Sequence, residues 1–326
     1  MSRLVFTAPA NLLLLGEYAV LEEGGLGLAA AAGPRVRVEA AREGPAGTAA
    51  PQRGAPPGEA PLEVSGAWGG GSFLWRPGRD SAAAPLVEAV ARCVSERLGR
   101  LPGGLVRTDS SAFYDGGRKR GYGSSAAVAV ALSRAFLALA GVEDPGTALE
   151  VALEAHRRSQ GGEGSGYDVL ASFHGGLGLF TGGRRPSWKA LRLPWLGPLV
   201  VLPGEGSVST REAIAGYRAW CLGRPGEARR FLAASNRAVE GFAGAATRGL
   251  ARACFARGRR LGLRLGGAIG VDASFRRRLL PAGFRSADCK SLGAGNELGW
   301  LFPEQPSVPE GCPVLTVEAE GLRCEP

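Results

Sequence analysis

The stretch that most constrains this chain is a glycine- and serine-rich turn in its first half, Gly121-Tyr122-Gly123-Ser124-Ser125-Ala126-Ala127. Two glycines one residue apart allow a tight turn and bring bare backbone N–H groups close to a ligand. Two serines then stand where a helix is predicted to begin, because a run rich in Ala, Val and Leu follows over 128–140. The unpaired N–H groups and positive dipole end of such a helix favour a bound phosphate.

This turn differs from two common phosphate-binding loops. It lacks the spacing of the Walker loop, and no third glycine follows at the offset of the dinucleotide-binding fingerprint. For a single turn of this kind, an ordinary Gly-Ser helix cap without a ligand is an equally good interpretation. Other glycine-rich loops in the chain favour the ligand-binding interpretation.

The length and apolar content set the size of the molecule. The chain has 326 residues, of which 45% are hydrophobic, enough for one large or two medium domains with real cores. No apolar run reaches membrane-spanning length, and the first residues do not precede a signal-type apolar core. We therefore expect a soluble, cytoplasmic protein without a membrane partner.

The net charge of +9 comes almost wholly from arginine. Of 39 basic residues only Lys119, Lys189 and Lys290 are lysines, so 36 are arginines. Many arginines suit a protein that handles phosphorylated or carboxylated small molecules, although a general bias toward Arg, Ala, Gly and Pro explains them equally well. No basic cluster is interleaved with aromatic residues, so we expect no nucleic-acid partner.

Cysteine and histidine usage argues against structural metal sites. The six cysteines form no CxxC pair, and the chain has only His156 and His174. Neither a zinc site, nor a disulfide framework, nor a His-rich metal centre is therefore indicated.

Hydrophobic periodicity predicts a mixture of strands and helices. The expected strands lie at 3–6, 36–39, 103–110, 199–202, 300–302 and 314–318, and a second apolar run follows the first strand at 12–15. The expected helices lie at 82–98, 128–140, 145–158, 212–222, 226–241 and 246–260. Between 42 and 61 the chain is rich in Pro, Gly and Ala without periodicity, which predicts a long surface loop or a disordered excursion. Strand-like sequence resumes at Leu62.

Two further glycine-rich loops accompany the first. One covers 159–168 and ends in Asp168, which is predicted either to cap the following helix or to face a cleft, two roles that are compatible. The other is Lys290-Ser291-Leu292-Gly293-Ala294-Gly295-Asn296-Glu297. Near the N-terminus, Glu17 lies in Gly16-Glu17-Tyr18-Ala19-Val20-Leu21 and is either a surface carboxylate or a group aimed into a site.

Together these segments form an ordered set that resembles the GHMP small-molecule kinases, and among them most closely the phosphomevalonate kinases. GEYAVL resembles the first family motif, KRGYGSSAA the second, AHRRSQGGEGSGYDVLASFHGG the segment that follows it, and KSLGAG the third. The resemblance spans nearly the whole chain. It implies an α+β fold with a ribosomal S5-like, ATP-binding domain over 1–186 and a ferredoxin-like domain over 187–326.

The resemblance also implies a reaction, the ATP- and Mg²⁺-dependent phosphorylation of 5-phosphomevalonate to 5-diphosphomevalonate in isoprenoid biosynthesis. Asp168 would face the acceptor oxygen, as a base or as an electrostatic orienter, and Lys119 would act with it. The remaining roles divide between the nucleotide (Gly121, Gly123, Ser124, Ser125, Ala126), Mg²⁺ (Ser125) and the acceptor (Asn11, Glu17, Ser165, Gly166, Ser209, Gly293, Ala294, Gly295). Such transfer asks a protein mainly for positioning and charge stabilisation.

Three positions bear on the choice of substrate. His156 stands where mevalonate kinases carry a magnesium-binding Glu, and Lys119 precedes the second motif, where mevalonate kinases lack a lysine; both favour a phosphorylated acceptor. Asn11 stands where the first motif usually has a lysine that helps transfer, and Asn296-Glu297-Leu298 replaces the Gly-Gly-Asp end of the third motif. These departures leave open a mevalonate or other hydroxy-acid kinase, and a nucleotide- or metabolite-binding protein that has lost transfer.

Overall fold

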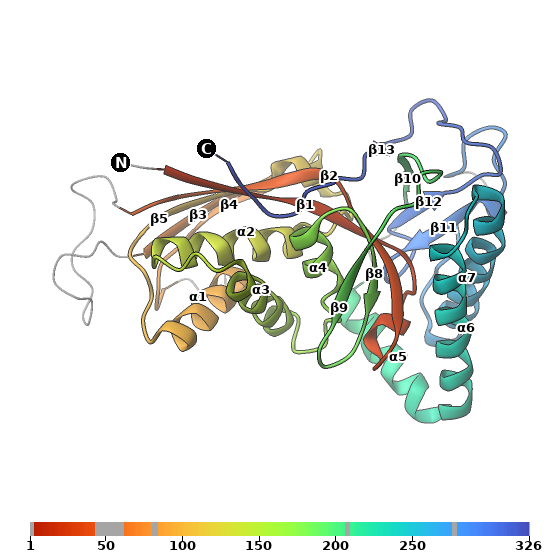
Figure 1. The fold of residues 1–326 in the computed structure, drawn as a ribbon, viewed down its shortest axis with the longest axis horizontal. Coiled ribbons are helices and arrows are strands. Elements are labelled where there is room, and N and C mark those ends of the chain that lie inside the picture. Colours follow the sequence, from red (N-terminus) through yellow and green to blue (C-terminus); the bar gives the residue numbers. More distant parts are fainter. Residues whose placement is uncertain (1–2, 43–61, 80–83, 206–208, 276–278, 326) are drawn as a thin grey trace. The chain divides into compact units, whose positions relative to one another are not determined.

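The computed structural model describes residues 3–42, 62–79, 84–205, 209–275 and 279–325 (Figure 1). They fold into two compact units, each built from several stretches of the chain. The first unit comprises Met1–Asn11, Pro34–His174 and Glu320–Pro326, and the second comprises Leu12–Gly33 and Gly175–Ala319. The predicted domain boundary between residues 186 and 187 rests on the family resemblance and stays a prediction.

The first unit contains a mostly antiparallel sheet in the order β14-β1-β2-β5-β3-β4. The strands are β1 (Arg3–Leu15), β2 (Leu26–Ala41), β3 (Leu62–Trp68), β4 (Gly71–Trp75), β5 (Gly104–Asp109) and β14 (Arg323–Glu325). The β1–β14, β2–β5 and β3–β4 pairs are antiparallel, whereas β3 and β5 are parallel. The C-terminal part of β1 and the N-terminal part of β2 belong to the second unit. Along β1 every residue from Val5 onward is buried, and apart from Thr7 and Asn11 these side chains are apolar.

Four helices cover one face of this sheet (Figure 1). They are α1 (Pro85–Leu98), α2 (Ser124–Leu139), α3 (Pro145–Ser159) and α4 (Tyr167–His174). The helix α2 is the central one, because it packs against the other three and against β5. Its composition matches that place: from Ala126 to Leu139 nearly every side chain is buried, so α2 is apolar all round.

The second unit has its own antiparallel sheet, in the order β11-β12-β10-β13. Its strands are β10 (Leu199–Pro203), β11 (Cys289–Leu292), β12 (Leu298–Leu301) and β13 (Val314–Leu315), and β11 packs against α7. Three helices follow one another in this unit: α5 (Thr210–Gly223), α6 (Pro225–Ala243) and α7 (Arg248–Ile269). In the same unit β8 (Leu177–Thr181) pairs with residues 26–30 of β2 and with β9 (Ser187–Leu191).

The expected helices are all present, and all but the last agree with their predicted extents within a few residues, but several strands differ from theirs. The runs 3–6 and 12–15 were expected as separate segments and instead form the single strand β1, which continues through Pro9. The strand expected at 36–39 is the end of the much longer β2, and the one expected at 314–318 is only Val314–Leu315. The helix expected over 246–260 continues to Ile269. The segment 43–61 lies outside the described residues.

Candidate functional site

The glycine-rich turn leads directly into α2, as its sequence predicts. Gly123 is the N-cap residue in the left-handed conformation, with φ 72°, and no side chain caps the helix. The first-turn N–H groups of an uncapped helix have no intrahelical acceptor. Three of these groups belong to Ser124, Ser125 and Ala126, so this end of α2 is a donor surface for an anion.

Asn11 lies beneath this turn and holds it in place. Its side chain is 2% exposed, and its amide nitrogen donates to the carbonyl oxygen of Gly123 and to Oγ of Ser172, each at 3.0 Å. Its backbone N–H donates to the carbonyl oxygen of Tyr122, also at 3.0 Å. A Cβ on Gly123 would come within 2.2 Å of the Asn11 side chain, so only glycine leaves room for it.

The Asn11 contact continues into α4. Ser172 is fully buried and donates its hydroxyl to the carbonyl oxygen of Pro9 at 2.8 Å. The hydroxyl therefore accepts from Asn11 and donates to β1 at the same time. The side-chain nitrogen of Asn11 thus hydrogen-bonds within the protein and supports the turn. The predicted contact of Asn11 with substrate stays a prediction.

Ser125 belongs to a polar cluster at the start of α2. Its Oγ lies 3.2 Å from Nε2 of His156, which is carried by α3 and is 1% exposed. On the other side of the imidazole, Nδ1 lies 3.6 Å from Oδ2 of Asp168, in the first turn of α4. The structure thus brings the predicted magnesium-binding hydroxyl and the predicted acceptor-facing carboxylate onto opposite edges of one ring.

The loop before α4 is held by Arg157. Its guanidinium donates to the carbonyl oxygens of Gly164, at 3.2 Å, and Ser165, at 3.3 Å. Gly166 then adopts φ 86°, a conformation that favours glycine. The helix α4 begins at Tyr167, so Asp168 is inside its first turn and is not the N-cap residue. Its Oδ1 accepts from the N–H of Val169 at 2.9 Å, and 18% of its side chain is exposed.

Lys119 is exposed on a short hairpin just before the turn. The hairpin pairs β6 (Tyr114–Asp115) with β7 (Arg118–Lys119), and Lys119 lies opposite Tyr114. An exposed ammonium on a hairpin is accessible to a phosphorylated ligand. Ten predicted site residues therefore fall in the first unit: Asn11, Lys119, Gly121, Gly123, Ser124, Ser125, Ala126, Ser165, Gly166 and Asp168.

The remaining predicted residues belong to the second unit, where Glu17 pairs with Lys290. Both side chains are nearly buried, and Lys290 also donates to the carbonyl oxygen of Ser291 at 2.8 Å. Burial raises the pKa of the Glu17 carboxyl, and the charge and hydrogen bond of Lys290 oppose that rise. Glu17 is therefore not a free surface carboxylate.

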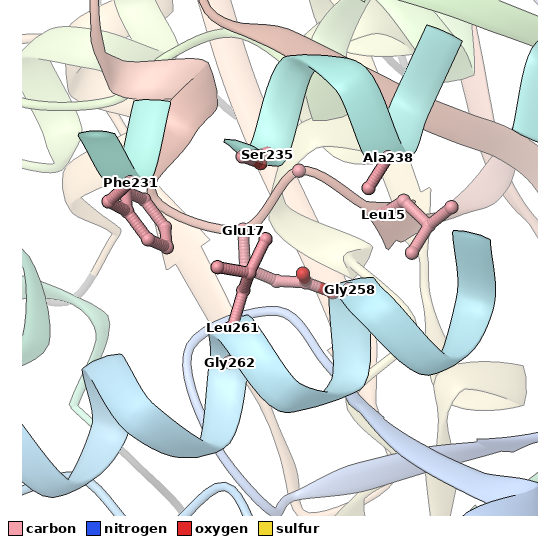
Figure 2. A pocket seen from close by; sticks show the side chains of 9 residues that line it. Leu15, Glu17, Phe231, Ser235, Ala238, Gly258, Leu261 and Gly262 are labelled. Atoms are coloured by element: carbon pink, nitrogen blue, oxygen red, sulfur yellow. The ribbon is translucent and has the colours of Figure 1, made fainter. Parts of the chain in front are cut away.

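Figure 2 shows the surroundings of Glu17 between two helices. Phe231, Ser235 and Ala238 come from α6, whereas Gly258, Leu261 and Gly262 come from α7. The cavity they line with Glu17 has a volume of about 10 Å³, about the space of one water molecule. A Cβ on Gly258 would lie 2.4 Å from the Leu15 side chain, so this glycine lets α7 approach the end of β1 closely.

The third glycine-rich loop is attached to the first motif through Tyr18. The Tyr18 hydroxyl donates to the carbonyl oxygen of Ala294 at 2.6 Å, and its ring packs at a tilt of 37° against Tyr217, with centroids 5.4 Å apart. Among the residues that the structure describes, Tyr18 is the one non-glycine residue with a positive φ, which is 63°. Gly293 has φ 70°, as a tight turn requires. These contacts give Gly293, Ala294 and Gly295 a fixed support within the second unit.

Ser209 directly precedes α5. It is the N-cap residue of this helix, and its Oγ accepts from the N–H of Glu212 at 3.3 Å. Its predicted contact with a phosphorylated acceptor stays a prediction.

Sequence reasoning missed Ser172, Tyr18 and Gln160, whose amide nitrogen lies 3.1 Å from Nε2 of His156. The contact between Asn11 and Ser172 joins residues 161 positions apart, so no local pattern reveals it. A weak signal existed for Ser172, because it follows Asp168 by one helical turn and so shares its face of α4.

The donor atoms present suit magnesium better than a transition metal. Within the described parts of the chain no group of three His, Cys, Asp or Glu side chains could hold a metal ion. Ser125 instead offers one hydroxyl oxygen next to a phosphate-binding helix end. Mg²⁺ commonly keeps several waters and takes its other oxygens from substrate phosphates, so a single protein oxygen is compatible with it.

No helix in the described residues is long and apolar enough to span a membrane.

Comparison with known proteins connects this geometry to a fold. Residues 85–176, which contain the turn, α2, α3 and α4, match the GHMP kinases N-terminal domain family. A Listeria innocua protein superposes with a TM-score of 0.78 at 18% identity, over 99% of both chains. The chain has the GHMP kinase fold. The predicted α+β fold class is therefore confirmed.

Two phosphomevalonate kinases are among the proteins similar to this GHMP-fold chain. The enzyme from Streptococcus pneumoniae, in complex with phosphomevalonate and AMPPNP, superposes with a TM-score of 0.71 at 18% identity, over 94% of this chain and 93% of that one. A phosphomevalonate kinase from a Streptomyces species is 33% identical over 180 residues. That match covers 52% of this chain and spans about half, 47%, of the Streptomyces protein.

Proposed function

We propose that this protein transfers the γ-phosphate of ATP to a small phosphorylated acceptor, and that the acceptor is 5-phosphomevalonate. The observation that carries the proposal is the uncapped start of α2 with Ser125 in its first turn and Asp168 nearby in the same unit. A helix end of this kind binds phosphate. The similarity to phosphomevalonate kinases from Streptomyces and Streptococcus pneumoniae supports this choice of acceptor.

In this proposal the first unit binds the nucleotide. Gly121 and Gly123 let the turn approach the ATP phosphates, which accept hydrogen bonds from the N–H groups of Ser124, Ser125 and Ala126. The Ser125 hydroxyl is a ligand of Mg²⁺. When bound, the metal supplies positive charge that neutralises the negative charge of the phosphates.

The acceptor is oriented by Asp168. Its carboxylate faces the attacking oxygen of the acceptor, and because a phosphate acceptor is already ionised at neutral pH, a strong general base is unnecessary. Lys119, Ser165, Gly166 and Ser209 contact the phosphorylated acceptor, whereas Gly293, Ala294 and Gly295 contact the transferring group. Asn11 and Glu17 contribute indirectly, by supporting the turn and the third loop.

A panel of acceptors tests this proposal. The purified protein is incubated with Mg-ATP and each of 5-phosphomevalonate, mevalonate and other hydroxy acids, and ³¹P NMR follows the product. A new diphosphate signal with 5-phosphomevalonate, and a much lower rate with the others, is expected. Transfer to mevalonate alone would assign the protein to a different acceptor.

One observation favours a second function, that of a binding protein without transfer. Asn11 occupies the position of the first-motif lysine and is buried under the turn, so it supplies no charge to a transferring phosphate. Stabilisation by Mg-AMPPNP without turnover of any acceptor would support this alternative.

A further inference from the structure

His156 is a buried polar side chain to which the proposed reaction gives no role. Its imidazole contacts side chains from three parts of the first unit. Nε2 lies 3.2 Å from Oγ of Ser125 on α2 and 3.1 Å from Nε2 of Gln160 just after α3, while Nδ1 lies 3.6 Å from Oδ2 of Asp168 on α4. A ring in this place touches both groups that the proposed reaction needs.

The contact with Gln160 places an amide nitrogen against one edge of the ring. An amide nitrogen only donates hydrogen bonds, so Nε2 of His156 must accept from Gln160. Nδ1 then remains as the ring donor on the side of Asp168. Among the described residues Nδ1 has no hydrogen-bond partner within 3.5 Å, and the carboxylate of Asp168 faces it just beyond that distance. Catalytic hydrogen bonds that are long in a free enzyme commonly shorten when substrate binds.

The same tautomer determines the orientation of the Ser125 hydroxyl. An unprotonated Nε2 can only accept, so the Ser125 O–H donates to it. The lone pair of Nε2 then accepts from both Ser125 and Gln160. The oxygen lone pairs of Ser125 then stay available for another partner. Available oxygen lone pairs are what Mg²⁺ requires of a hydroxyl ligand, and Ser125 is only partly buried.

We propose that His156 is a positioning residue that orients the Ser125 hydroxyl toward Mg²⁺ through Nε2 and the Asp168 carboxylate toward the acceptor through Nδ1. It is not itself a metal ligand, because its Nε2 lone pair is already used. This inference rests on the proposed function. A buried histidine that only fills space would not require this order of donors and acceptors.

Two substitutions separate the two edges of the ring. In His156→Gln the amide group extends as far as Nε2 and can accept from Ser125, but no group remains to face Asp168. In His156→Asn the amide group ends near Nδ1 and can donate to Asp168, but the contact with Ser125 is lost. His156→Leu removes both contacts and serves as the matched control for the loss of polarity.

The first readout is the affinity for AMPPNP with and without Mg²⁺, measured by calorimetry. Groups that orient a metal ligand typically contribute about 10–100-fold in metal affinity or activity. We therefore expect His156→Asn and His156→Leu to lose about 10-fold or more of the Mg²⁺-dependent gain in affinity, and His156→Gln to lose much less. The kcat for acceptor phosphorylation should show the opposite order, with the larger loss in His156→Gln than in His156→Asn. Equal losses in all three variants for both quantities would overturn the proposal.

The second readout tests the tautomer directly and needs neither substrate nor turnover. The chain has only two histidines, so ¹⁵N-histidine NMR gives two ring systems, and His174→Asn assigns them. For His156 we expect a protonated Nδ1 and an unprotonated Nε2. A protonated Nε2 would overturn the proposal. If no acceptor is phosphorylated, the proposed function fails, but the NMR spectrum and the AMPPNP affinities still decide the role of His156.

Discussion

Asn11 shows how one buried amide can take the place of an expected lysine. Its two side-chain hydrogen bonds, to the Gly123 carbonyl and to Ser172, connect the glycine turn with α4. A lysine at this position would lose both and would place an ammonium where the asparagine is 2% exposed. Burying an unpaired charge is costly. Restoring the family residue is therefore a structural change as well as a chemical one.

From this we predict that Asn11→Lys lowers stability without creating a faster enzyme. Asn11→Ala, which leaves the Gly123 carbonyl without its side-chain donor, should cost about 1–3 kcal/mol, and Asn11→Lys should cost more. Urea unfolding gives the stabilities, and single-turnover transfer gives the rate. A stable Asn11→Lys protein with a raised rate would show that a lysine can reach the phosphate from this position.

Gly123 and Asn11 are coupled, because the space beside the glycine is filled by the asparagine side chain. In Gly123→Ala the new methyl group clashes with Asn11, in addition to a strain of about 1–2 kcal/mol from the left-handed conformation. We predict that Gly123→Ala costs less stability in an Asn11→Ala background than in the wild type, as measured by a double-mutant cycle. Strictly additive losses would mean that the turn can move away from Asn11.

Among the elements, the start of α2 differs from the start of α3 in a way that hydrogen exchange can detect. In α3 the carboxylate of Asp144 accepts from the N–H groups of Gly146 and Thr147, whereas no side chain caps α2. Without ligand, amides at the start of α2 should exchange fast. We predict that Mg-AMPPNP slows exchange in the 121–127 segment and leaves the start of α3 unchanged. Equal protection of both helices, or of neither, would contradict nucleotide binding at α2.

The Glu17–Lys290 pair connects the segment after β1 to β11 within the second unit, and its stability contribution depends on pH. Lys290→Met removes the charge that opposes the raised pKa of Glu17, so that pKa rises further. The native state then binds a proton at a pH where the unfolded chain does not. Stability of this variant therefore increases as the pH falls through the raised pKa toward the ordinary glutamate value.

We predict that Lys290→Met costs about 3–5 kcal/mol at pH 8, the usual cost of leaving one buried charge unpaired, and clearly less at pH 5. The Glu17→Gln/Lys290→Met double variant is the control, because it has no buried carboxylate to protonate. Urea unfolding at both pH values measures the difference between the two variants. If this difference does not change with pH, Glu17 is not the titrating group.

At the scale of the whole molecule, the sequence predicts secondary structure well wherever a local pattern is decisive. The helix starting at Ser124 is confirmed, since it depends on neighbouring residues. The continuity of β1 was missed because Pro9 interrupts the pattern, although the surrounding sheet tolerates it. The contacts of Asn11 with Ser172 and of Glu17 with Lys290 depend on tertiary packing between distant segments, which a local pattern cannot predict.

The contrast between a buried and an exposed lysine has a consequence for chemical labelling. Lys290 is 3% exposed, whereas Lys119 and Lys189 are exposed, and the chain has no other lysine. An amine-reactive reagent applied to the folded protein should therefore modify two lysines and leave the third intact. We predict that the phosphorylated acceptor slows modification of Lys119 but not of Lys189, which acts as an internal reference in the same mass spectrum. If the acceptor slows modification of Lys119 and Lys189 equally, the acceptor acts on the reagent and not on the hairpin. If it slows neither, the hairpin does not contact the acceptor.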